Sequence, residues 1–237
     1  MTPAVWGRAE IIASLEGTLR AGHTVLLFGP VGVGKTAVLE AIAARARAQG
    51  VPCGISERTT AVSDLTRALS SAYPSVDAQC ARTQRALRAR LRIAAEAQPG
   101  LLLLDHLDVA GSAFKGVVRS FRGLGMGVLV VADIDHPRDH ERVRRLRLTH
   151  REVELPPLHG QTMRGLVRDL VARVHLPLPL SPDDTSAVVA ATAGLPGRAV
   201  WIVEALLAPT AWRNGRPRAD WLRTEALIAA TESYRRR

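Results

Sequence analysis

The sequence has little of three features that would point to particular classes of protein. Cysteine occurs only twice in 237 residues, at Cys53 and Cys80, and these two do not have the spacing of a metal site. No apolar run reaches the roughly 18 residues of a membrane helix. The N-terminal residues lack the basic and apolar regions of a secretory signal. We therefore expect a cytoplasmic protein with reduced thiols, no zinc site and no membrane partner.

Lysine is equally scarce, because Lys35 and Lys115 are the only two and every other basic side chain is an arginine. The net charge is nevertheless +10, and the isoelectric point is about 11.1. A GC-rich coding bias would explain the use of arginine in place of lysine, but it would not explain the excess over acidic residues. That excess favours a polyanionic partner, most simply DNA bound without sequence specificity.

Apolar runs and helical patterns alternate through the first two thirds of the chain. Strands are predicted at 23–28, 51–56, 101–105, 127–133 and 151–155. Helices are predicted between them, at 9–20, 35–48, 61–72, 78–97 and 113–123. Strands that are apolar throughout and separated by helices predict an α/β fold, with a parallel five-stranded sheet flanked by helices.

The pattern changes at Pro156-Pro157, after which only helices are predicted, at about 160–174, 182–193, 197–207 and 218–233. We therefore predict an α/β core at 1–157, a small all-helical lid at 158–208 and a basic C-terminal tail helix at 209–237.

A glycine-rich run lies between the first predicted strand and the helix that follows it. The sequence "FGPVGVGKT" at 28–36 matches the pattern G-x-x-x-x-G-K-[ST], the P-loop or Walker A motif. Its glycines allow backbone N–H groups to approach phosphate oxygens, and the following helix directs its positive end at the anion. The motif predicts that ATP is bound by Gly29, Pro30, Val31, Gly32, Val33, Gly34, Lys35 and Thr36.

Two residues of the motif are expected to bind the phosphates and Mg²⁺, and an acidic residue after a later strand is expected to help bind Mg²⁺. Lys35 is expected to reach the β- and γ-phosphates, and the hydroxyl of Thr36 to hold Mg²⁺. Such a site needs an acid at the end of a neighbouring strand, and "LLLLD" offers Asp105. Asp105 could also merely cap its strand. The motif upstream favours the metal, so Thr36 and Asp105 are the predicted Mg²⁺ ligands.

With these motifs in place, the sequence resembles the AAA+ ATPases of the origin-initiator and transposition-helper type, with the STAND P-loop ATPases close behind. The stretch "VWGRAEIIASL" at 5–15 is similar to the segment that covers the adenine in those families, which implies that Trp6 and Arg8 lie near the base. Core packing is the alternative for Trp6. The end of the fourth predicted strand matches the sensor 1 position, which implies that Asp133 meets the nucleotide, although a strand-end cap is an equal alternative.

Arginines fill two further positions that the resemblance gives a role. "AGLPGRAVWIVEAL" at 193–206 looks like the sensor 2 helix, so Arg198 would reach the γ-phosphate from the lid, or would be a solvated helix-start residue. The stretch before the last core strand often carries an arginine finger that completes the site of a neighbouring subunit. Arg147 is the candidate that we name, with Arg144 and Arg145 as alternatives, and the role implies a homo-oligomer.

The residue after Asp105 departs from the family pattern. Most AAA+ members have a glutamate there to polarise the attacking water, whereas this chain has His106. A neutral imidazole can accept a proton from water. Alternatively, "DHLD" resembles a D-x-x-D variant in which Asp108 does this work, or His106 only packs and Asp108 is solvated. Hydrolysis is therefore expected to be slow.

A basic helix and the basic tail are the candidate DNA contacts. Arg82, Arg85 and Arg88 have the spacing of one helix face, and the tail adds arginines beside Trp212 and Trp221. Both tryptophans could instead anchor the tail on the lid. We predict an ATPase that assembles on DNA when ATP is bound and recruits an unidentified protein partner. The alternative is a STAND-like nucleotide switch with little hydrolysis and no DNA role.

Overall fold

The computed structural model describes residues 5–57, 61–76, 83–106, 112–133 and 151–235. By their contacts these residues form two compact units. The first comprises Met1–Pro30 and Lys35–Leu155, and the second comprises Val31–Gly34 and Pro156–Arg237. The boundaries that we predict at 157 and 208 remain predictions, and each unit is described by itself below.

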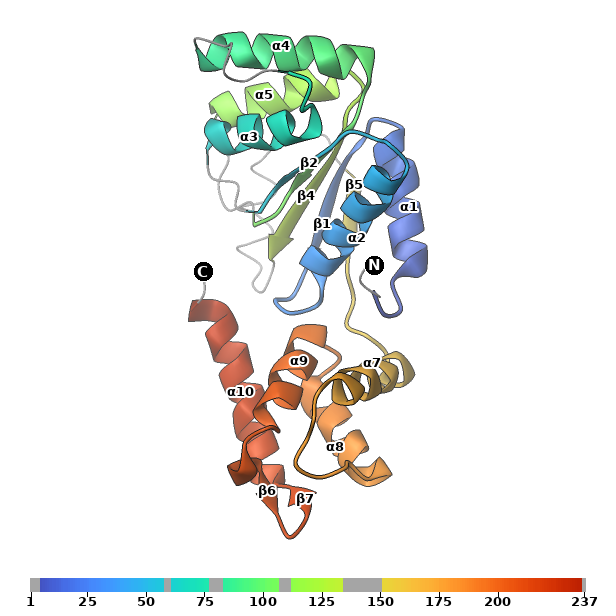
Figure 1. The fold of residues 1–237 in the computed structure, drawn as a ribbon, viewed down its shortest axis with the longest axis vertical. Helices are drawn as coiled ribbons and strands as arrows, with labels where there is room; N and C mark the ends of the chain where they lie inside the picture. Colours follow the sequence, from blue (N-terminus) through green and yellow to red (C-terminus); the bar gives the residue numbers. More distant parts are fainter. Residues whose placement is uncertain (1–4, 58–60, 77–82, 107–111, 134–150, 236–237) are drawn as a thin grey trace. The chain divides into compact units, whose positions relative to one another are not determined.

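A five-stranded parallel sheet forms the centre of the first unit (Figure 1). The strands are ordered β2-β3-β4-β1-β5, so β1 lies between β4 and β5. Their bounds are β1 Thr24–Gly29, β2 Cys53–Ser56, β3 Leu101–Leu104, β4 Gly127–Asp133 and β5 Arg151–Glu154. All four pairings are parallel, which confirms the predicted sheet. The carboxyl ends of these strands therefore meet at one edge.

Helices cover both faces of this sheet, because its central strands are apolar on both sides. Helices α1 (Ala9–Arg20) and α2 (Lys35–Ala48) contact one face, chiefly along β1 and β4. Helices α3 (Val62–Ala72), α4 (Gln84–Ala97) and α5 (Ser112–Arg122) form the layer on the other face (Figure 1). Burial on both faces is typical of parallel sheets in α/β proteins.

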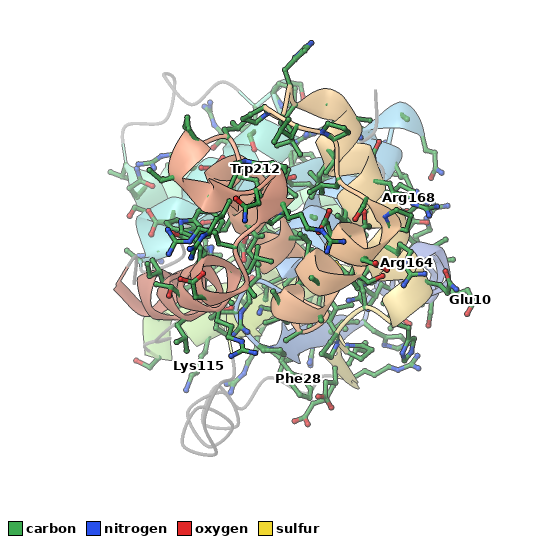
Figure 2. All side chains as sticks on the ribbon, turned by 90° about the horizontal axis from the view of Figure 1, so that it is seen from below. Glu10, Phe28, Lys115, Arg164, Arg168 and Trp212 are labelled. Atoms are coloured by element: carbon green, nitrogen blue, oxygen red, sulfur yellow. The ribbon has the colours of Figure 1, made fainter. Side chains whose placement is uncertain are left out.

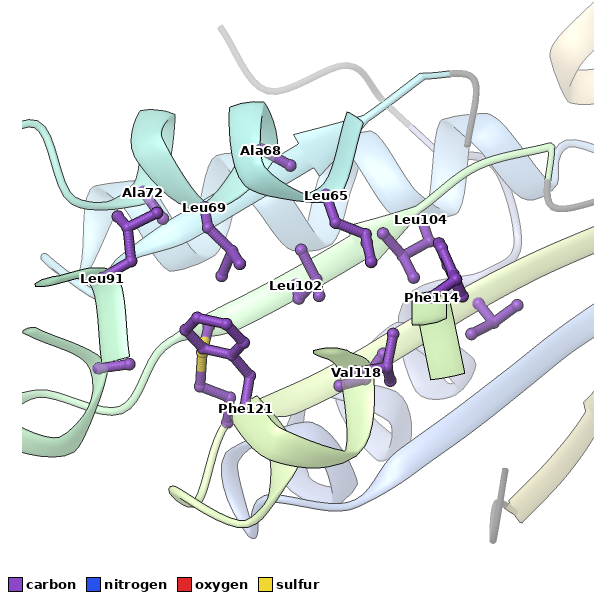
Figure 3. Close-up of a cluster of buried hydrophobic side chains, with 14 of the residues drawn as sticks. Leu65, Ala68, Leu69, Ala72, Leu91, Leu102, Leu104, Phe114, Val118 and Phe121 are labelled. Atoms are coloured by element: carbon purple, nitrogen blue, oxygen red, sulfur yellow. The ribbon is translucent and has the colours of Figure 1, made fainter. Parts of the chain in front are cut away.

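A cluster of buried side chains lies between the sheet and the α3–α5 layer. Leu65 and Leu69 of α3, Leu102 of β3 and Phe121 of α5 point toward one another there (Figure 3). Gly54 of β2 allows α3 to pack this closely, because a Cβ at that position would overlap the carbonyl oxygen of Ala68. A glycine in a strand often marks such a backbone approach.

The start of α4 differs from the sequence prediction. Thr83 has an extended backbone, with φ −143°, and its hydroxyl accepts a hydrogen bond from the N–H of Ala86 at 3.1 Å. Thr83 is therefore the N-cap, and the helix begins at Gln84 instead of residue 78. Arg82, the first member of the predicted basic face, lies outside the described residues. Arg85 is exposed and Arg88 is half-buried.

Four helices make up most of the second unit, namely α7 Gly160–Arg173, α8 Pro182–Thr192, α9 Pro196–Ala205 and α10 Ala219–Arg235. Helix α7 packs on α8 and α9, and α10 packs on the same two helices. Arg164 and Arg168 lie one turn apart on α7 (Figure 2), and the guanidinium of Arg164 donates to the Ser186 hydroxyl at 3.3 Å.

A short hairpin corrects the prediction that only helices follow Pro157. Strands β6 (Trp212–Arg213) and β7 (Arg216–Pro217) pair in antiparallel fashion, after a 3₁₀ turn at Pro209–Ala211. The turn residues Asn214 and Gly215 have φ values of 53° and 76°. An Asn-Gly pair is the strongest short-range signal for such a turn, and our prediction did not use it.

No helix in the described part of the chain is both long enough and apolar enough to span a membrane.

Candidate nucleotide-binding site

The site residues of the first unit come from three strand ends that the sheet order brings together. The P-loop follows β1, Asp105 follows β3, and Asp133 ends β4. Because β4 lies between β3 and β1, Asp133 pairs in register with Gly29. Asp105 is held by its own backbone N–H, which donates to the Ser56 carbonyl of β2 at 2.8 Å. Our sequence reasoning missed Ser56, since its role depends on strand register.

The loop itself has the backbone that its glycines were expected to provide. Gly32 and Gly34 have φ values of 78° and 98°, in the left-handed region that side chains disfavour. Val33 is buried, whereas Pro30, Val31 and Gly32 are half-buried. Helix α2 starts at Lys35 directly after the loop, so its N-terminal N–H groups are available to an anion.

Lys35 is held by three oxygen atoms. Its ammonium donates to the carbonyls of Gly29 and Pro30, both at 2.8 Å, and lies 2.7 Å from the Oδ1 atom of Asp133. The side chain of Lys35 is only 5% exposed and that of Asp133 18% exposed. Two carbonyls and a carboxylate thus keep a buried cation in place beside the loop. The ion pair with Asp133 was not part of our sequence prediction.

The hydroxyl of Thr36 and the carboxylate of Asp105 are also in contact. Thr36 Oγ1 donates to Asp105 Oδ2 at 2.8 Å, and Asp105 is buried. A hydroxyl beside a carboxylate at the end of a strand is the donor set with which P-loop enzymes hold Mg²⁺. No group of three or more His, Cys, Asp or Glu side chains that would bind a metal on its own occurs among the described residues. The metal role of the two residues remains a prediction.

His106 lies between two carboxylates. Its Nε2 atom is 3.8 Å from Asp105 Oδ2, and its Nδ1 atom is 3.8 Å from Asp133 Oδ2. The backbone N–H of His106 donates to Asp105 Oδ1 at 2.9 Å, and its φ of 47° is in the left-handed region. The side chain is 55% exposed, so a water molecule can reach the imidazole. The predicted role of His106 as a base remains a prediction.

The N-terminal segment contributes a buried donor and a buried cation. The indole N–H of Trp6 is buried and has no hydrogen-bond acceptor in the described part of the chain. Arg8 is 4% exposed, and burial lowers the pKa of its guanidinium. A buried donor without an acceptor can bond to a ligand or to an ordered water molecule. The predicted contact of both residues with the base stays a prediction.

The described structure does not place three of the predicted site residues relative to Lys35, Thr36 and Asp105. Asp108 and Arg147 lie outside the described residues, as do Arg144 and Arg145. Arg198 is in the first turn of α9, within the second unit, and its role toward a phosphate remains a prediction.

Two arginines of the C-terminal tail form ion pairs with acidic residues of their own unit. Arg216 pairs with Asp183 at 3.7 Å and with Asp184 at 3.6 Å, and Arg218 pairs with Asp220 at 2.6 Å. The indole of Trp212 donates to the carbonyl of Leu206 at 2.8 Å, which fixes the hairpin within its own unit.

The chain is similar to solved structures of replication initiators. It matches Aeropyrum pernix ORC2, solved as ADPNP and ADP complexes, with 14% identity and a TM-score of 0.64 over 97% of this chain and 69% of that one. Aeropyrum pernix ORC1 in complex with DNA has 20% identity and a TM-score of 0.58, over 97% and 66%. Domain III of the Thermotoga maritima replication initiation protein DnaA has 14% identity and a TM-score of 0.55, over 98% and 94%. At these identities the likeness shows the fold.

The chain spans about two thirds of the length of the two ORC proteins. A search of curated proteins finds no match. The family model named "ATPase family associated with various cellular activities (AAA)" matches residues 25–158, more than half of the chain, and this confirms the resemblance drawn from the motifs. The chain belongs to this AAA family and is therefore an ATPase that binds ATP.

Proposed function

We propose that this ATPase assembles with further copies of itself on DNA in an ATP-dependent way, and that the assembly recruits or regulates a protein partner. The observation that carries the proposal is the grouping of Lys35, Thr36 and Asp105 at one end of the sheet, with Lys35 and Asp105 buried, in a unit whose helices α4 and α5 are strongly basic. Such a site gives a nucleotide-dependent state, and the basic layer gives a surface for a polyanion.

The surface that best fits DNA is the outer side of α4 and α5. Helix α4 has four arginines and one acidic residue, and α5 has one lysine, two arginines and no acidic residue. Arg85, Arg90 and Arg92 are exposed, and no ion pair joins them to an acidic residue in the part of the chain that the structure describes, whereas Arg216 and Arg218 of the tail have acidic partners. Such arginines release the counterions of DNA when they bind phosphates, so binding would weaken steeply with salt. The similar ORC1 protein was solved in complex with DNA, which supports the same kind of partner here.

In this proposal the site works with Mg²⁺, which would be held by Thr36 and Asp105 and would supply charge neutralisation at the phosphates. Lys35 binds the β- and γ-phosphates, and Arg198 and Arg147 add positive charge, the latter from a neighbouring subunit. His106 or Asp108 accepts the proton of the attacking water. Because neither residue is the usual glutamate, turnover is slow.

The choice between the two bases has a direct test. If Asp108 is the base, Asp108→Ala lowers the turnover number far more than it weakens ATP binding, whereas His106→Ala has the smaller effect. The reverse order assigns the task to His106. Steady-state rates and ATP affinities of both variants, measured side by side, separate the two cases.

The experiment that tests the proposed function is sedimentation and ATPase assay with and without double-stranded DNA at low salt. We expect ATP to promote large DNA-bound species and DNA to raise the ATPase rate. A variant with Arg85, Arg90 and Arg92 changed to Gln should lose DNA binding. A comparison variant with Arg216 and Arg218 changed to Gln should lose much less binding per charge removed, because those side chains pair with acids.

A second function is favoured by one observation, the histidine at the glutamate position. A site with a weak base suits a nucleotide switch that binds a protein partner and hardly hydrolyses ATP. Failure of the protein to bind DNA at low salt, together with retained ATP binding, would replace the first proposal with this one.

A further inference from the structure

The P-loop lysine has no spare hydrogen-bond donor. An ammonium group carries three N–H donors, and those of Lys35 face three oxygens, on Gly29 and Pro30 at 2.8 Å and on Asp133 at 2.7 Å. The side chain is only 5% exposed, so a phosphate cannot bind Lys35 simply by replacing a water molecule. A phosphate oxygen can therefore bind Lys35 only if one of the three present partners gives way.

Asp133 is the partner that a phosphate would displace. The two carbonyls belong to neutral peptide groups. Asp133 is the charged partner, and its carboxylate forms an ion pair with Lys35, as a negatively charged phosphate oxygen would. Asp133 ends β4 directly opposite Gly29, so its carboxylate cannot move far from the loop. A phosphate beside Lys35 would stand next to this second negative charge, and like charges in a mostly buried site repel strongly.

Asp133 has a second polar neighbour besides Lys35. Its Oδ2 atom lies 3.8 Å from Nδ1 of His106, whereas its Oδ1 atom lies 2.7 Å from the ammonium of Lys35. The carboxylate thus has the imidazole as a second polar neighbour when a phosphate takes its place beside the lysine.

We propose that Asp133 competes with the nucleotide phosphates for Lys35, so that the carboxylate holds the P-loop lysine in the nucleotide-free protein and lowers its affinity for ATP. This inference rests on the proposed nucleotide site and deepens it. It gives Asp133 a role opposite to that of a polar residue that binds the γ-phosphate. Breaking the Lys35–Asp133 ion pair is then part of nucleotide binding.

The test is the affinity for MgATP, measured by titration calorimetry in the full chain and in Asp133→Asn. We expect the variant to bind about tenfold more tightly or better, because the amide keeps the shape of the side chain and removes the competing charge. Asp133→Glu retains the charge and should bind as weakly as the wild type. Asp169→Asn in α7 is the matched control for net charge, since Asp169 pairs with Arg173 on an exposed helix surface, and it should change the affinity less than twofold.

A second measurement uses the protein without nucleotide. Asp133→Asn should lower the thermal midpoint of the nucleotide-free protein and should increase the rise in midpoint that saturating MgATP produces. Asp133→Ser provides the same comparison if the Asn variant does not fold.

Equal or weaker MgATP binding by folded Asp133→Asn and Asp133→Ser would overturn the inference while leaving the nucleotide site intact. Absence of MgATP binding by the wild type would remove the nucleotide site itself, and the inference with it.

Discussion

Replacement of Lys35 by alanine is the most direct perturbation of the site, and the structure allows its effect to be worked out. In the nucleotide-free protein the ammonium makes two hydrogen bonds at 2.8 Å and an ion pair at 2.7 Å. With nucleotide bound, the donor that Asp133 releases would face the phosphate oxygens. A hydrogen bond to a charged group contributes about 1.5–3 kcal/mol net, so loss of this contact should weaken binding by about that amount.

That free energy corresponds to ATP binding weaker by about 10- to 10²-fold in Lys35→Ala. The loss lies toward the lower end if the wild type must first break its ion pair with Asp133, since the variant has no such pair to break. The assay is titration with MgATP by calorimetry, with circular dichroism to show that the variant is folded. Lys115→Ala is the natural control, because it removes the only other lysine of the chain, on α5.

We expect Lys115→Ala to bind ATP within about twofold of the wild type, because Lys115 is not among the residues of the site. If folded Lys35→Ala bound MgATP as tightly as Lys115→Ala, the reasoning that identifies the P-loop as the phosphate site would be refuted.

Three other predictions concern the metal, the packing and the response to alkaline pH. Thr36→Val removes a hydroxyl of the predicted metal site and should raise the Mg²⁺ concentration needed for half-maximal ATPase activity about tenfold, and an unchanged Mg²⁺ requirement would count against the site. Gly54→Ala should lower the free energy of unfolding in urea by about 1–3 kcal/mol or more, because its Cβ would meet a backbone carbonyl of α3. Gly116→Ala on α5, where a Cβ meets nothing within 4 Å, should instead raise it by about 0.5–1 kcal/mol. Burial raises the pKa of Tyr73 to about 12 from its ordinary value near 10. The contribution of Tyr73 to the free energy of unfolding should therefore be constant below pH 10 and be lost between pH 10 and 12, and Tyr73→Phe should remove that part of the alkaline fall in urea titrations.

The parts of the fold that depend on local sequence were predictable. Strands β1, β3 and β4 are predictable because they are nearly continuous apolar runs, and α2 because a P-loop must be followed by a helix. The start of α4 was not, because Thr83 forms a cap within a stretch whose composition is helical on both sides. The hairpin at Trp212–Pro217 was missed because strands of two residues have no periodicity, although Asn214-Gly215 gave a usable signal.

The site shows the same division. Lys35, Thr36 and Asp105 could be named from motifs, because their tasks follow from position in a loop or at a strand end. The ion pair of Lys35 with Asp133 could not, because it depends on the register of β1 against β4. The flanking of His106 by two carboxylates likewise needs the order of β3 and β4 in the sheet.

The pairing of Gly29 with Asp133 has a consequence for the order of events in folding. These two residues are far apart along the chain, and parallel pairing of distant strands requires the closure of a long loop, which is a slow step. In chains whose strands β1 and β4 have not yet paired, the P-loop is therefore not next to Asp133 or to the end of β3. ATP would bind these chains poorly and would selectively stabilise those that have completed the sheet. ATP present during refolding should accordingly raise the yield of native protein, because it slows the unfolding of chains that have formed the complete sheet.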